Sequence, residues 1–217
     1  MGRSAEKAVK DNSNKNFWQR FAKIYTTFMT KNDGAYAGIC ESLKHYIDGE
    51  KHVLELACGT GQITFLMADQ AAAWIATDYS ENMVKEAEKR KIQEVINCKA
   101  TFEVQDATNL TYENETFDVV VIANALHIMP DPDAALKEIQ RVLKKDGILF
   151  APTFVYEIGY SKLFIWMMER AGFKTYHKWT RTEYTKYVSQ RGFRVIGDTL
   201  VKGKPLSECV LVATKEG

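Results

Sequence analysis

The segment from residue 53 to residue 61, with the sequence VLELACGTG, constrains the fold of this chain more than any other. A short apolar run ends in a turn of small residues, and residues 62–68 then have the composition of a helix. A residue without a Cβ atom lets the backbone turn this tightly and leaves room for a ligand against it. The segment therefore predicts a strand, a glycine turn and a helix, the entry unit of a nucleotide-binding α/β fold. Glu55 is unusual for a buried parallel strand and needs a reason.

An acid follows the next predicted strand. Residues 74–77 predict that strand, and Asp78 comes after it, 17 positions beyond Gly61 and 23 beyond Glu55. A carboxylate in this place can accept hydrogen bonds from both hydroxyls of a ribose. The alternative is a turn or N-cap residue, a position that Ser80 could also fill. The spacing from the glycine turn favours the ribose interpretation.

The glycine pattern indicates which nucleotide. Residues 59–64 read GTGQIT, so the third glycine of a dinucleotide fingerprint is missing. Residues 55–61, ELACGTG, instead resemble the first motif of the class I S-adenosylmethionine-dependent methyltransferases, acid-x-(Gly/Ala)-x-Gly-x-Gly. Residues 78–83, 102–107, 117–127 and 136–149 resemble later motifs of that family, in the same order. The resemblance is especially close to the branch that includes the ubiquinone/menaquinone-biosynthesis methyltransferases.

The resemblance implies a fold, a cofactor and a binding site. The implied fold is α/β: a doubly wound, mostly parallel seven-stranded sheet of Rossmann-like type with an N-terminal helical lid. The implied cofactor is S-adenosyl-L-methionine, leaving as S-adenosyl-L-homocysteine. Asp78 would take the ribose, Tyr79 and Met83 would enclose the adenine, and Asp106 would accept from the adenine amino group. The cofactor-binding residues expected from the resemblance are Glu55, Ala57, Gly59, Gly61, Asp78, Tyr79, Met83, Asp106, Ala107 and Asn124.

Two side chains are candidate catalytic residues. His127 follows the predicted strand at 118–123 and has a pKa suited to proton transfer, but it could instead pack in the loop before Pro130. Tyr25 could close over the sulfonium with its ring face, or it could simply pack within the helix expected at residues 16–25. His177 is a weaker candidate base. Methyl transfer needs no metal, and we expect none.

Alternating strands and helices from residue 52 to about 155 predict the sheet, after a helix at 35–46. We expect residues 1–50 to form a helical lid and residues 51–217 the cofactor-binding core, with 156–180 covering the acceptor site. Asp133 is predicted to cap a helix that ends near Lys145, and Gly147 to terminate it. Residues 182–190 predict a helix, and 193–198 with 209–214 a closing strand pair.

Composition limits the partners. A net charge of +1 gives no sign of a nucleic-acid partner. The four cysteines lack metal-site spacing and indicate reduced thiols, hence a cytoplasmic protein without a disulfide framework. No apolar run reaches about 20 residues, and the charged start does not resemble a signal peptide. The aromatic, methionine-rich segment 156–179 is typical of an amphipathic helix that packs on the core. It could instead form an apolar wall over the acceptor pocket, which would favour a small apolar or aromatic methyl acceptor.

Two other functions stay open at this point. One is a nicotinamide-dependent oxidoreductase, which the missing third glycine and the absence of a Tyr-x-x-x-Lys pair disfavour. The other is a non-catalytic module that binds S-adenosylmethionine, because these motifs specify binding rather than transfer. Fold alone does not decide between them.

Overall fold

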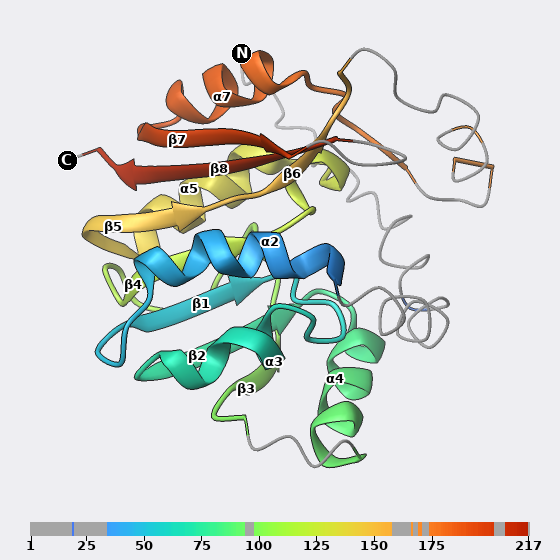
Figure 1. The fold of residues 1–217 in the computed structure, drawn as a ribbon, viewed down its shortest axis with the longest axis vertical. Helices are drawn as coiled ribbons and strands as arrows, with labels where there is room; N and C mark the ends of the chain where they lie inside the picture. The colour runs from blue at the N-terminus through green and yellow to red at the C-terminus, as the bar shows by residue number, and fades with distance from the viewer. Residues whose placement is uncertain are drawn as a thin grey trace, which may run out of the picture.

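The computed structural model describes residues 19, 34–93, 98–157, 166, 169–170, 174–201 and 207–216. In this part of the chain helices cover a single twisted sheet (Figure 1). The strands are β1 (His52–Leu56), β2 (Ala73–Asp78), β3 (Thr101–Val104), β4 (Phe117–Ile122), β5 (Leu143–Phe150), β6 (Thr153–Val155), β7 (Phe193–Val201) and β8 (Ser207–Lys215). The helices are α2 (Gly34–Leu43), α3 (Thr64–Met67), α4 (Glu81–Gln93), α5 (Pro132–Val142) and α7 (Arg181–Ser189), with short 3₁₀ turns at Lys44–Tyr46, Ala68–Gln70 and Leu126–Ile128.

The strand order is β3-β2-β1-β4-β5-β8-β6, with β7 paired to β8. Strands β1 to β5 are parallel, and β8 is antiparallel to β5, β6 and β7. The arrowheads of β1 and β5 accordingly point the opposite way from that of β8 (Figure 1). The predicted doubly wound sheet is confirmed, with eight strands among the described residues instead of seven. The extra strand, β6, is separated from β5 by Pro152, which has no N–H for a sheet ladder.

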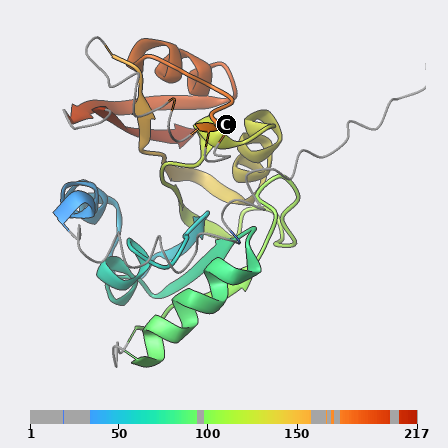
Figure 2. The same ribbon diagram turned by 90° about the vertical axis from the view of Figure 1, so that its right-hand side faces the viewer.

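Side chains on successive strand positions alternate between two apolar cores. Val53 of β1 and Val119 of β4 join Leu43 of α2 in one core. Leu54 of β1 joins Ile139 of α5 in the other. Figure 2 shows α2 and α5 on opposite sides of the sheet. The strands are therefore covered on both faces, as their continuous apolar runs predict.

The helix after residue 130 differs from the prediction at both ends. Its N-cap is Asp131, whose Oδ1 accepts from Ala134 N at 2.9 Å, while Asp133 lies in the first turn. The helix ends at Val142 because Leu143 is already extended, with ψ of 134°. Gly147 therefore does not end a helix. It lies in β5, where a Cβ would come within 2.9 Å of Lys144 O.

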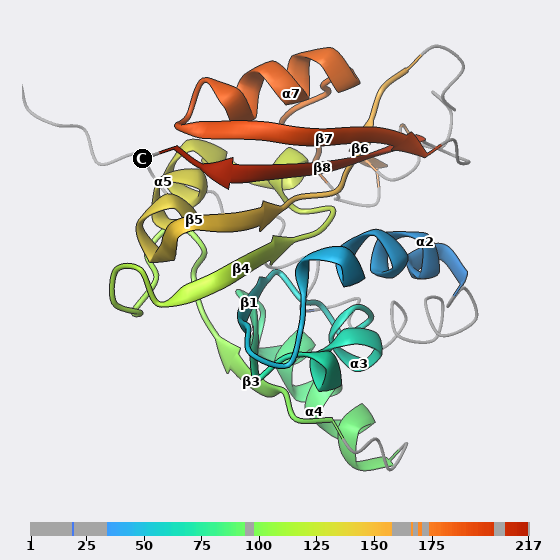
Figure 3. The same cartoon turned by 60° about the vertical axis from the view of Figure 1, so that its left-hand side comes forward.

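The helix after the glycine turn is also shorter than predicted. Gly61 has φ of 85°, outside the helical region, so α3 begins only at Thr64 and tightens to a 3₁₀ turn after Met67. Among the described residues, the helix predicted at 182–190 and the closing strand pair are confirmed, while most of the predicted lid and of segment 156–180 lies outside the described residues. In Figure 3, α7 lies along β7 at the opposite end of the sheet from α4. Of the helices described, none has the length and apolar character needed to cross a lipid bilayer.

Candidate functional site

The sheet's topology marks one place for a ligand. After β1 the chain builds outward through β2 and β3, then returns to β4 on the other side of β1. In open α/β sheets a ligand binds at such a reversal, outside the carboxyl ends of the strands. The turn after β1, Asp78 at the end of β2 and Asn124 after β4 all lie at this edge.

Three residues with left-handed backbone form the turn after β1. Ala57, Gly59 and Gly61 have φ of 54°, 58° and 85°. Cys58 N donates to Thr77 O at 2.9 Å, which fastens the turn to β2. Ala57 carries a Cβ in a conformation that costs an L-residue about 1–2 kcal/mol. Such strain is concentrated at functional sites.

A contact that the sequence did not predict holds the turn from α4. Arg90 Nη1 donates to Thr60 O at 2.7 Å, and its guanidinium lies 4.9 Å from the centre of the Phe65 ring. The bond spans 30 residues. No local sequence pattern predicts this hydrogen bond, because an arginine near the end of a helix rich in charged residues more often faces solvent.

Asp78 lies across the turn from β2, as predicted. Its Oδ2 accepts from Gly59 N at 3.0 Å and its Oδ1 from Ser80 N at 2.8 Å. Burial raises the pKa of the Asp78 carboxyl to about 6, against the lowering effect of these two N–H donors. A carboxylate has about four lone-pair sites, so each oxygen can accept a further hydrogen bond. The ribose role of Asp78 stays a prediction that this geometry permits.

Glu55 has a clear structural reason to be in β1. Its side chain is only 2% exposed, and Oε2 accepts from Thr64 Oγ1 at 2.6 Å and from Trp74 Nε1 at 2.9 Å. It thereby connects α3 and β2 to β1 on either side of the glycine turn. Burial raises the pKa of Glu55 to about 7, against the lowering effect of its two donors.

The raised pKa of Glu55 predicts a pH dependence of stability. Below its unfolded pKa the carboxyl is neutral in both states. As the pH rises toward about 7 the unfolded chain loses the proton first, so the free energy of unfolding should fall. Glu55→Gln should flatten this slope, by up to about 1.4 kcal/mol per pH unit. Urea unfolding of both proteins between pH 4.5 and 7.5 measures the difference, with Glu41→Gln on exposed α2 as the control. If the free energy of unfolding has the same slope against pH in wild type and in Glu55→Gln, Glu55 is charged in the folded protein throughout this pH range.

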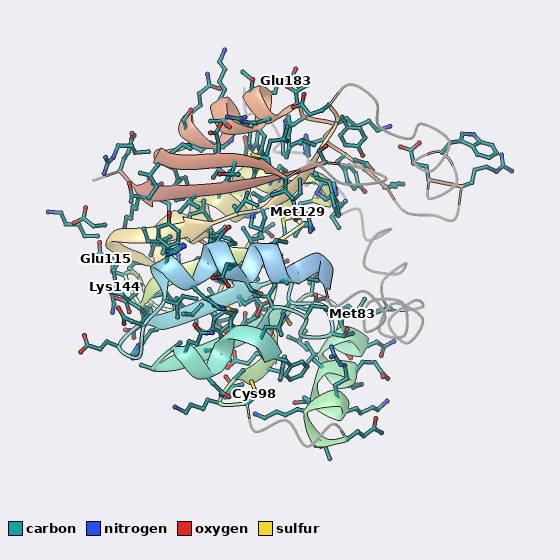
Figure 4. All side chains as sticks on the ribbon, viewed as in Figure 1. Met83, Cys98, Glu115, Met129, Lys144 and Glu183 are labelled. Carbon is teal, nitrogen blue, oxygen red and sulfur yellow. The ribbon has the colours of Figure 1, made fainter. Side chains whose placement is uncertain are left out.

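The residues expected around the adenine lie at the same edge. Met83, in the first turn of α4, is 2% exposed, and Tyr79 and Ala107 are partly buried. Figure 4 shows Met83 at the end of the sheet where β1 stops, and Glu115 and Lys144 at the opposite end. Asp106 Oδ1 accepts from Thr108 N at 3.0 Å, which closes the turn that contains it. Their adenine contacts stay predictions.

Asn124 makes a contact that the sequence did not suggest. Its backbone is left-handed, with φ of 53°, and its N donates to Pro152 O at 2.8 Å. The side-chain Nδ2 donates to Glu208 Oε1 on β8, also at 2.8 Å. Asn124 Oδ1 is buried and has no hydrogen-bond partner among the described residues. Glu208 was missed because 84 residues separate the pair in sequence.

The two catalytic candidates have different outcomes. Tyr25 lies outside the described residues. His127 is 4% exposed, and its Nδ1 is 2.9 Å from Thr153 Oγ1. Burial, with a smaller contribution from His177, lowers the pKa of His127 to about 3. These contacts favour the packing alternative for His127. His177 stacks on Trp179 at 4.7 Å, and burial lowers its pKa.

Comparisons with known proteins agree with this geometry. Residues 54–151 match the family described as a methyltransferase domain. The chain is 37% identical over 97 residues to a demethylmenaquinone methyltransferase of Lactobacillus johnsonii, an alignment covering 43% of this chain and 40% of that protein. It is 26% identical over 164 residues to a ubiquinone biosynthesis O-methyltransferase of Coxiella burnetii, covering 72% of this chain and 69% of that one. The chain spans between 32% and 57% of the length of the first three curated relatives that it matches.

Solved structures share the fold. One is the Thermotoga maritima protein described as an S-adenosylmethionine-dependent methyltransferase, possibly a histamine N-methyltransferase. It superposes with a TM-score of 0.73 at 21% identity, covering 93% of this chain and 99% of that one. At this level of identity the likeness concerns architecture.

Proposed function

We propose that this chain, which carries a class I S-adenosylmethionine-dependent methyltransferase domain, transfers a methyl group from that cofactor to a small aromatic or apolar acceptor. The predicted resemblance to this family is confirmed, and with it S-adenosylmethionine as the cofactor of the domain. The observation that carries the proposed activity is the turn after β1, where Asp78 accepts from Gly59 N beside two further left-handed residues, Ala57 and Gly61.

The residues present fit the cofactor. Ribose hydroxyls are donors, and both oxygens of Asp78 can accept further hydrogen bonds. When bound, S-adenosylmethionine supplies a methyl group on a positively charged sulfur, which an in-line displacement removes. The chain would hold the cofactor through Asp78 and the turn, surround the adenine with Tyr79, Met83, Asp106 and Ala107, and present Asn124 near the methionine end. Catalysis would then come mainly from alignment and exclusion of water.

The acceptor class is the finer part of the proposal. The names of the two relatives, one for demethylmenaquinone and one for ubiquinone biosynthesis, support an aromatic quinol or phenol. The small net charge of +1 supports a small molecule over nucleic acid. We also propose that the chain does not insert stably into a membrane. A cytoplasmic location belongs to the same proposal, supported by four free cysteine thiols.

Two cover segments complete the proposal. We place a lid within residues 1–50 and an acceptor-site cover within 156–180. Gln19 supports the first, because its O accepts from Asn82 Nδ2 at 2.9 Å, next to Met83 on α4. Leu43 of α2, by contrast, is fully buried in the core. Tyr176 N and His177 N support the second, because both donate to His127 O after β4.

Calorimetry followed by a transfer assay tests the proposed function. S-adenosylhomocysteine should bind at least tenfold more tightly than NAD⁺ or NADP⁺, as the missing third glycine predicts. Radiolabelled methyl should then pass to catechol or 1,4-dihydroxynaphthalene and not to a tRNA pool. Tighter binding of a nicotinamide cofactor would favour an oxidoreductase. Cofactor binding without transfer to any acceptor would leave only a non-catalytic binding module.

A further inference from the structure

We propose that Glu208 accepts the proton of the methyl acceptor, held in place for that task by Asn124. The inference rests on the proposed function and adds a catalytic residue to it. Glu208 is the second residue of β8, and β8 runs antiparallel to β5. The start of β8 therefore lies at the same edge of the sheet as the carboxyl ends of β4 and β5.

One buried acceptor atom beside Glu208 lacks a donor. Asn124 Nδ2 donates to Glu208 Oε1 at 2.8 Å. The other atom of the same amide group, Asn124 Oδ1, is buried without a partner among the described residues. Buried acceptors without donors are uncommon in folded proteins and call for an explanation. A ligand with an O–H or N–H group would supply the missing donor.

The backbone holds Asn124 in this orientation. Its φ of 53° is left-handed, a conformation that asparagine adopts more readily than most residues with a Cβ, and its N–H is fixed to Pro152 O at 2.8 Å. Ala57, after the adjacent strand β1, has a left-handed backbone as well. Strained residues persist where the surrounding structure over-determines them, often at ligand sites.

The strand order places Glu208 on the acceptor side. Along the edge the order is β2, β1, β4, β5 and β8, so Asp78 and Glu208 lie on opposite sides of Asn124. With the ribose at Asp78, the chain would hold the methionine end of the cofactor near Asn124, on the β4 side of the turn. The acceptor then enters from the β5–β8 side, where Glu208 lies.

The surroundings of Glu208 suit a base at neutral pH. Burial raises the pKa of its carboxyl to about 7, against the lowering effect of the Asn124 amide. Phe154 of β6 and Val201 of β7 are its uncharged partners across the sheet. Cys209, next on β8, stays a neutral thiol because burial raises its pKa to about 12. His127, whose pKa burial lowers to about 3, could not hold a proton at pH 7.

The proposed step balances in atoms and charge. The acceptor's O–H or N–H bond breaks, and its proton passes to Glu208 Oε2. The freed electron pair forms the new bond to the methyl carbon. The carbon–sulfur bond breaks, and its electron pair stays on sulfur, which neutralises the positive charge there. Glu208 then releases the proton to solvent.

Glu208→Gln tests this role because glutamine keeps the shape and an oxygen that can accept from Asn124. With catechol as the acceptor, kcat should fall by about 10²–10⁴-fold, the usual contribution of a general base. Affinity for S-adenosylhomocysteine should change less than twofold. The wild-type rate should rise with pH through about 7, and that step should be absent in Glu208→Gln. Glu115→Gln, at the opposite end of the sheet, is the matched control and should behave as wild type (Figure 4).

A second measurement needs no turnover. In a ¹³C carboxyl NMR titration of the unliganded protein, a group titrating near pH 7 should disappear in Glu208→Gln. It should move to higher pH in Asn124→Gly, because glycine tolerates the positive φ and removes the amide donor.

The two proposals fail in different ways. If the wild type transfers methyl and Glu208→Gln keeps its rate and pH profile, Glu208 is not the proton acceptor, and the proposed function stands. If the wild type binds no S-adenosylhomocysteine and transfers nothing, the proposed function is wrong, and the role of Glu208 with it.

Discussion

Asp78→Ala will weaken S-adenosylhomocysteine binding by at least about tenfold while the fold is retained. The substitution removes the proposed acceptor for two ribose hydroxyls, and hydrogen bonds to a charged group contribute roughly 1.5–3 kcal/mol each. A loss of about 1.4 kcal/mol is already a factor of ten. The same change removes a charge that burial disfavours, since the pKa of Asp78 is raised to about 6. It also leaves the N–H groups of Gly59 and Ser80 without their acceptor, so the free energy of unfolding should fall modestly while the fold is retained. Calorimetry and circular dichroism measure the two quantities.

Asp118→Ala is the matched control for this experiment. Asp118 also accepts from a backbone N–H, that of His52 at 2.9 Å, but it lies in β4 at the amino end of the sheet. Cofactor affinity should be unchanged in this variant. Asp78→Asn adds a finer comparison because its amide oxygen can still accept from Gly59 N. Wild-type affinity in Asp78→Ala would mean that the ribose binds elsewhere.

Gly61→Ala will destabilise the protein by roughly 2–4 kcal/mol and distort the glycine turn. The backbone φ of 85° costs an L-residue about 1–2 kcal/mol. The new Cβ would also lie 2.7 Å from Cε2 of Phe65. The Phe65 ring cannot move freely because it packs 5.6 Å from Phe102 and lies beneath Arg90. Thermal unfolding should show a fall of roughly 5–15 °C, and S-adenosylhomocysteine affinity should fall with it.

Gly38→Ala is the same substitution at a position where the structure predicts an increase in stability instead of a decrease. Gly38 lies in α2, and nothing is within 4 Å of a Cβ there. Alanine should stabilise this helix by about 0.5–1 kcal/mol.

A Gly61→Ala/Phe65→Leu double variant should recover part of the stability lost in Gly61→Ala, since the smaller side chain removes the clash. If Gly61→Ala melts like wild type, the turn is not held in this conformation.

The sequence predicted well those features that local pattern determines. The strand at 53–56, the glycine turn and Asp78 follow from hydrophobic runs and residue types within about 25 positions. The choice of Asp133 as helix cap missed a local signal, because Pro132 is favoured at the first helical position and so marks Asp131 as the N-cap. Asp133 instead binds Arg191 Nε at 2.7 Å, across 58 residues.

The same limit explains what was missed in the candidate site. Arg90 reaches Thr60 across 30 residues, and Asn124 reaches Glu208 across 84. The two alternatives for His127 could be separated only by its partner Thr153 on β6, a strand that the sequence did not predict. Contacts of this kind depend on strand order, which composition and periodicity do not encode.

The position of β8 has a consequence for how the protein is made. A ribosome delivers the chain in sequence order, so β5, β6 and β7 emerge before residues 207–216. In the finished sheet β8 pairs with all three of them. Until it emerges, the backbone edge of β5 has no partner, and such an edge readily pairs with another chain. Newly made molecules should therefore be most prone to aggregate just before β8 appears, when chaperones matter most.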